Sequence, residues 1–98
     1  MTDAELLRAW SGERCEDSFR TLVTKYLGLV ENVAMRRTGD AALLKDVAQT
    51  VFTRLAANAD SVHPSPTLAP WLHQCALRTA IDALRSEITR HRHLKAYS

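Results

Sequence analysis

Three arginines near the end of the chain would lie on one face if this segment formed a helix. Arg78, Arg85 and Arg92 are seven residues apart, and Asp82 lies between the first two. Because seven residues make almost two helical turns, the three guanidinium groups form a row that rises about 10 Å per step. Groups so spaced can bind successive phosphates of a nucleic acid. The same residues could instead form ordinary surface ion pairs with Asp82, so the pattern leaves both interpretations open.

A second group of polar residues falls on one face of a helix expected at about residues 41–59. This face lies opposite an apolar stripe of leucine, valine and phenylalanine. A lightly charged surface rich in hydrogen-bonding groups suits the docking of a partner helix, although a merely solvated face has the same composition. The residues of this polar face are Asp46, Gln49, Thr50, Thr53 and Arg54.

The sequence shows no pattern typical of an enzyme or a metal site. Cys15 and Cys75 lie far apart without a CxxC partner, and the four histidines are not at ligand spacing with one another or with carboxylates. It contains no glycine-rich phosphate loop and no pair of acid, base or nucleophile in a known motif. We therefore expect a non-catalytic protein that needs no cofactor or metal and binds partners through its surface.

The elements that position these residues are predicted to be helices. Apolar residues recur at intervals of three and four along nearly the whole chain, and no segment alternates with a period of two. We predict an all-α, compact four-helix domain over residues 1–93, followed by a short tail at 94–98. The helices are expected at about 3–10, 15–38, 41–59 and 68–91. Residues typical of helix ends mark these boundaries: Thr2 with Glu5, Ser11-Gly12, Gly39, Asp40 and Thr67.

Composition fits one small domain inside the cell. The chain has 98 residues, of which 46% are hydrophobic and 24% charged, and its formal net charge is only +2. The charge is uneven, since the first third is acidic and the last 22 residues carry five basic and two acidic side chains. The N-terminus lacks a signal-peptide pattern and no apolar stretch is long enough to cross a membrane. We expect a cytoplasmic protein that has no membrane partner.

Several segments, in their order and spacing, resemble region 2 of bacterial RNA polymerase sigma factors of the extracytoplasmic-function (ECF) group of the sigma-70 family. The segments are Asp46-Val47-Ala48-Gln49-Thr50-Val51-Phe52, then Trp71-Leu72, then Arg78-Thr79-Ala80-Ile81-Asp82-Ala83-Leu84-Arg85. Glu5-Leu6-Leu7 and Asp17-Ser18-Phe19 also resemble the start of that domain. The family's second DNA-binding domain, the region 4 helix-turn-helix, has no counterpart in these 98 residues.

The resemblance implies a role in transcription initiation. It assigns Asp46 and Gln49 to the clamp helices of the largest subunit of core RNA polymerase, with Thr50, Thr53 and Arg54 nearby. It implies that the loop before the Trp71-Leu72 helix holds a base flipped out of the non-template strand of the promoter minus-ten element. The DNA-contacting residues that it implies are His63, Ser65, Leu68, Trp71, Arg78, Arg85, Arg90 and Arg92.

A different class of function stays open beside this one. The chain could be a small helical protein-interaction module that does not bind DNA, its basic row being a solvated face. Its ligand would then be another protein, such as an anti-sigma factor or an adaptor. Salt-dependent binding of single-stranded DNA separates the two hypotheses.

Overall fold

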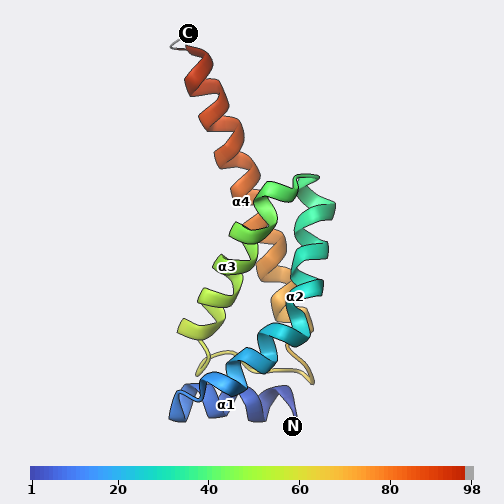
Figure 1. Ribbon diagram of the computed structural model, residues 1–98, viewed down its shortest axis with the longest axis vertical. Coiled ribbons are helices and arrows are strands. Elements are labelled where there is room, and N and C mark those ends of the chain that lie inside the picture. The colour runs from blue at the N-terminus through green and yellow to red at the C-terminus, as the bar shows by residue number, and fades with distance from the viewer. Residues whose placement is uncertain (97–98) are drawn as a thin grey trace.

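The structure, a computed structural model, describes residues 1–96, and over that range it consists of four helices joined by short segments (Figure 1). The helices are α1 (Asp3–Glu13), α2 (Glu16–Thr38), α3 (Ala41–Ala57) and α4 (Ala69–Ala96). The predicted all-α four-helix fold is confirmed. Within residues 1–96, no helix combines the length and the apolarity that crossing a membrane requires.

Most helix ends follow the chemistry that the sequence predicts. Thr2 and Glu5 form a capping box at the start of α1. Gly39 ends α2 at φ 64°, in the left-handed region that glycine adopts without strain, and the Asp40 carboxylate caps α3 by accepting from the amide of Ala42 at 2.9 Å. The expected end of the first helix at Ser11-Gly12 is wrong. α1 continues to Glu13, and Arg14 takes the left-handed cap instead, donating its amide to the carbonyl of Trp10.

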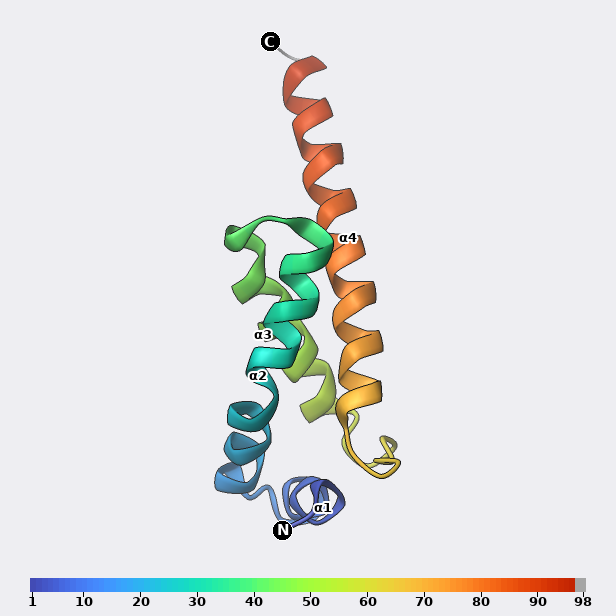
Figure 2. The ribbon, with the colours of Figure 1, turned by 90° about the vertical axis from the view of Figure 1, so that its right-hand side faces the viewer.

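α2 is the central helix of the bundle and packs against each of the other three. Its inward side meets α3 and α4 in one continuous apolar core, and α1 crosses the lower end of α2 (Figures 1 and 2). The side chains enclosed completely by this core are Leu22, Val30, Val51, Leu55, Leu68 and Leu72. Burial of this apolar surface is the main force that holds the four helices together.

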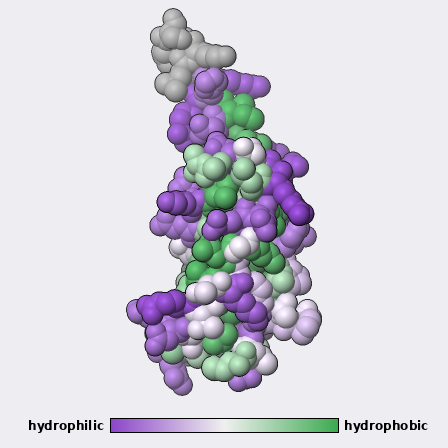
Figure 3. Space-filling view, turned by 45° about the vertical axis from the view of Figure 1, so that its right-hand side comes forward, coloured by the Kyte–Doolittle hydropathy of each residue, from purple (hydrophilic) through white to green (hydrophobic). Residues whose placement is uncertain are grey.

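α4 is longer than predicted and projects beyond the bundle. It continues to Ala96, and its last turns stand clear of α2 and α3 (Figure 2), which gives the molecule an extent of 53 × 22 × 19 Å. Ile88, on this projecting part, is 48% exposed, and apolar side chains show there at the surface (Figure 3). The expected domain boundary after residue 93 therefore falls within α4. Residues 97–98 of the predicted tail lie outside the described residues.

Candidate functional site

The polar face of α3 is exposed as the sequence predicts. Asp46, Gln49, Thr53 and Arg54 are exposed and Thr50 is half-buried. In the part of the chain that the structure describes, no hydrogen bond or salt bridge occupies their side chains, and Phe52 of the same helix is buried in the core. The helix therefore offers free hydrogen-bonding groups while its opposite side anchors it.

An apolar groove between α2 and α3 borders this polar face. Phe19, Val23 and Leu27 of α2 line one side of the groove, and Gln49 and Thr53 of α3 lie on the other. Leu27 is 37% exposed. Apolar surface rimmed by hydrogen-bonding groups is the composition of a protein–protein interface. Nothing in the sequence indicates this groove, because its walls come from two helices.

The loop between α3 and α4 is anchored in the core at both ends. Val62 near its start and Leu68 at its end are buried, whereas His63 and Ser65 between them are exposed. The Ser65 amide donates to the carbonyl of Thr67 at 3.2 Å, which closes a tight turn at the tip. The prediction that Leu68 contacts DNA is corrected here, because its side chain has no exposed surface and belongs to the core.

Trp71 lies in the first turns of α4, directly after this loop. Its ring is half-buried and packs against the core residues. It therefore links the loop end of α4 to the rest of the bundle.

The arginine row on α4 points away from the core. Arg78, Arg85 and Arg92 are exposed, whereas the opposite side of the helix packs on α2 and α3. Among residues 1–96, neither Arg78 nor Arg85 forms a salt bridge, so the surface ion pairs with Asp82 that the sequence also allowed are not formed.

Arg90 differs from the other three arginines. It comes twelve residues after Arg78, which rotates it by about 120° from the row at 100° per residue. Its guanidinium lies 3.7 Å from the Glu87 carboxylate. Arg90 is thus exposed but lies off the face that carries Arg78, Arg85 and Arg92.

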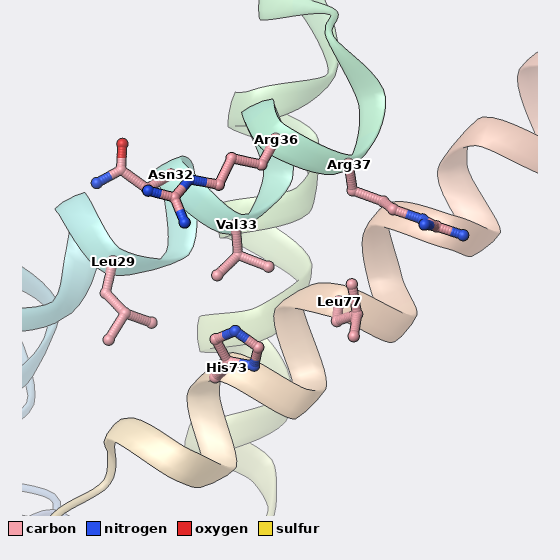
Figure 4. Close-up of a pocket in the computed structure, with 7 residues that line it drawn as sticks. All are labelled: Leu29, Asn32, Val33, Arg36, Arg37, His73 and Leu77. Atoms are coloured by element: carbon pink, nitrogen blue, oxygen red, sulfur yellow. The ribbon is translucent and has the colours of Figure 1, made fainter.

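A groove between α2 and α4 adds basic groups that the sequence analysis missed (Figure 4). Leu29, Val33 and Leu77 form its apolar part, and Leu77 directly precedes Arg78. Figure 4 shows His73 rising from α4 into the groove and Arg37 reaching from α2 toward α4. The remaining lining residues are Asn32 and Arg36, so no carboxylate lines it. The signal that could have indicated this groove is the pair Arg36-Arg37 in the last turn of α2.

One carboxylate, that of Asp3, lies inside the molecule, and its pKa is shifted. Asp3 is only 3% exposed, and burial alone would raise its pKa. Hydrogen bonds from the Lys25 ammonium, the Tyr26 hydroxyl and the Leu68 amide outweigh burial, and the pKa of Asp3 is lowered. Burial and the bond to Asp3 raise the pKa of Tyr26, and the same carboxylate raises the pKa of Lys25. The group is therefore a carboxylate at neutral pH, held by cationic and neutral donors.

Comparison with known families decides the affiliation of the chain. The family described as Sigma-70 region 2 matches residues 22–90. The chain belongs to this family. The resemblance seen in the motifs of α3 and α4 is therefore confirmed, and the match covers α2 from Leu22, α3, the loop and most of α4.

Individual sigma factors are similar to this region 2 chain. It is 34% identical over 93 residues to the probable RNA polymerase sigma factor RfaY of Xanthomonas campestris, covering 95% of the chain and 22% of that protein. It is 29% identical over 83 residues to the RNA polymerase sigma factor CarQ of Myxococcus xanthus (85% and 45%). It is 28% identical over 72 residues to the ECF RNA polymerase sigma factor SigW of Bacillus subtilis (74% and 38%).

The chain spans less than half the length of each of these relatives. No solved structure matches it.

Proposed function

We propose that this region 2 domain is the promoter-recognition domain of an ECF-type sigma factor. It binds core RNA polymerase through α3, and it binds the promoter minus-ten element through the loop and α4. It carries out no chemistry and acts in the cytoplasm with polymerase. An anti-sigma factor that covers the same surfaces is a further expected partner.

The observation that carries the proposal is the row of arginines that lack carboxylate partners. Arg78 and Arg85 stand free on the outer face of α4, on the helix that begins directly after the exposed loop tip. Guanidinium groups without an ion-pair partner bind phosphates most favourably, because no internal ion pair has to be broken first. The α2–α4 groove, lined by Arg36, Arg37 and His73, adds basic groups on another side of α4, because Leu77 lies about 100° around the helix from Arg78.

DNA opening by such a surface is a binding process. In this proposal the exposed side chains of His63 and Ser65 at the loop tip contact an unstacked base, while the arginines of α4 neutralise the backbone beside it. Unpairing costs a few kcal/mol, which base contacts and phosphate contacts offset. The domain thus traps the open strand and needs no energy source of its own.

Polymerase binding is assigned to the other exposed surface. Asp46 and Gln49 supply hydrogen-bonding groups at the rim of the apolar α2–α3 groove, in which a partner helix finds both polar and apolar contacts. This surface and the arginine row lie on different helices, so one chain can hold polymerase and DNA together.

The test is capture of core RNA polymerase by the chain. The double substitution Asp46→Ala/Gln49→Ala removes the two polar side chains and leaves the core unchanged, and we expect it to abolish capture. Gln74 is an exposed residue of α4, and we expect Gln74→Ala to leave capture intact. Circular dichroism verifies that both variants fold. Equal capture by the double variant and the wild type contradicts the assignment of this face.

The alternative, a protein-interaction module that does not bind DNA, makes a different prediction. Such a module captures a protein partner but shows no salt-dependent affinity for single-stranded DNA. The ion pairs that this interpretation expects around Asp82 are not formed among residues 1–96, which favours the sigma factor function.

A further inference from the structure

A buried carboxylate joins three elements at the base of the exposed loop. Asp3, at the start of α1, accepts a hydrogen bond from the Lys25 ammonium of α2 at 2.8 Å through Oδ1. Through Oδ2 it accepts from the Tyr26 hydroxyl of α2 and, at 2.9 Å, from the backbone amide of Leu68. Leu68 is the last residue before α4. One side chain thus ties α1 and α2 to the point at which the loop ends.

Two of these hydrogen bonds, those from Tyr26 and from the Leu68 amide, have no substitute in solvent. Tyr26 is 7% exposed and Leu68 has no exposed surface, so water does not replace Asp3 as an acceptor for their groups. A buried donor without an acceptor is costly, and a buried carboxylate is tolerated only when it is paired. Loss of the carboxylate therefore leaves the Tyr26 hydroxyl and the Leu68 amide unpaired, and only movement of these groups, the end of the loop included, relieves it.

The position of the loop tip depends on this anchor. Only residues 63–67 lie between the buried Val62 and the buried Leu68. On either side of Leu68, Thr67 and Ala69 are also joined, because the Thr67 hydroxyl accepts a hydrogen bond from the Ala69 amide at 3.3 Å. This bond connects the loop to the first turn of α4. Because so short a segment has few conformations once both ends are fixed, a shift at Leu68 changes the direction of the His63 and Ser65 side chains.

We propose that Asp3 is a positioning residue for promoter reading, acting through Tyr26 and the Leu68 amide to hold the 63–67 tip in the orientation that discriminates between bases. This role rests on the proposed function, because it presumes that the tip contacts a promoter base. It assigns α1 a part in base selection, exerted through the loop.

The experiment compares wild type with Asp3→Asn and Tyr26→Phe, and Glu13→Gln serves as the control for charge loss on an exposed site of the same helix. Asp3→Asn keeps the shape of the side chain, and Tyr26→Phe removes one hydroxyl but keeps the ring. Each folded protein selects from single-stranded oligonucleotides randomised over six positions, well below its melting temperature. Base enrichment is read by sequencing, and exchange of the Leu68 amide by NMR.

The expected result is selective. In Asp3→Asn, the enrichment of the preferred base at one position falls about tenfold, which corresponds to the loss of about one hydrogen bond to that base. The Leu68 amide exchanges faster than in the wild type. Tyr26→Phe shows a smaller change in the same direction, and Glu13→Gln shows none. The salt dependence of total binding stays at the wild-type value in all variants. A purely structural role lowers the melting temperature but does not flatten the preference of the protein that remains folded.

Two outcomes overturn the inference in distinguishable ways. Undiminished base enrichment and unchanged Leu68 exchange in Asp3→Asn refute the positioning role and leave the proposed function standing. A wild-type chain that binds DNA but enriches no base refutes base reading by the loop, and the role of Asp3 falls with it.

Discussion

Replacing Arg85 with alanine tests whether the outer face of α4 binds DNA phosphates. Arg78 and Arg85 are seven residues apart, and at 1.5 Å per residue this is about 10.5 Å along the helix. A DNA strand with B-form rise presents a phosphate about every 3.4 Å, so the two arginines meet phosphates about three positions apart. Each arginine of the row therefore has a phosphate of its own, and their contributions are expected to add.

The magnitude follows from counterion release. Each phosphate contact on a single strand contributes about 0.7 to the slope of log affinity against log salt concentration. Three contacts, from Arg78, Arg85 and Arg92, give a slope of about −2, which is a loss of about 18-fold in affinity between 50 and 200 mM salt. Arg85→Ala reduces the slope to about −1.4, a loss of about sevenfold over the same range.

The assay is fluorescence anisotropy of a labelled single-stranded oligonucleotide, titrated with each protein at four salt concentrations. Arg20→Ala is the matched control, because Arg20 is exposed on α2 and its removal changes the net charge equally. Its pairing with Asp17 at 3.0 Å leaves it no free charge for a phosphate. If Arg20→Ala lowers the slope as much as Arg85→Ala, binding depends on net charge alone, and the reasoning from the arginine row is refuted.

Three further predictions concern stability, measured by urea unfolding and, for Leu72→Ala, also by thermal unfolding. The pKa of Asp3 in the folded chain is lowered below its ordinary 3.8, so the unfolded chain binds the proton first as the pH falls. The free energy of unfolding therefore decreases as the pH falls below about 4, and we expect Asp3→Asn to remove this decrease. Thr79→Val raises the free energy of unfolding by about 1 kcal/mol, because the buried Thr79 hydroxyl has no partner among the described residues; a loss of stability contradicts this. Leu72→Ala, at a fully buried site, lowers it by about 2–5 kcal/mol and the melting temperature by at least about 10 °C; a shift below about 4 °C contradicts the packing described.

The sequence predicted those parts of the fold that depend on local chemistry. The capping box at Thr2, the glycine cap at Gly39 and the aspartate cap at Asp40 lie where predicted, because each involves residues a few positions apart. The polar face of α3 was predicted for the same reason, since helical periodicity alone separates it from the core.

Errors arose where long-range packing decides the outcome. Gly12 is a weak helix former, yet α1 continues through it. Leu68 was assigned to the DNA surface by the resemblance to the family, whereas the core encloses it completely. In each case the local pattern was ambiguous.

The anchor at Asp3 marks the limit of such reasoning. Asp3 and Leu68 are separated by 65 positions, and nothing in the sequence near either residue indicates that they meet. An acidic residue in the first turn of a helix already has a sufficient local explanation, because its negative charge interacts favourably with the positive end of the helix dipole. Only the crossing of α1 over the end of α2 brings this carboxylate to the loop.

The arrangement of the helices makes α2 the physical link between the two proposed surfaces. It supplies Val23 and Leu27 to the groove beside the polymerase face, Tyr26 to the loop anchor, and Arg37 to the basic groove against α4. Tyr26 and Leu27 are neighbours in the sequence, so a shift of α2 moves both surfaces together. Substitutions on the outer faces of α3 or α4 therefore affect one partner alone, whereas a change in the packing of α2 alters the binding of polymerase and DNA at once.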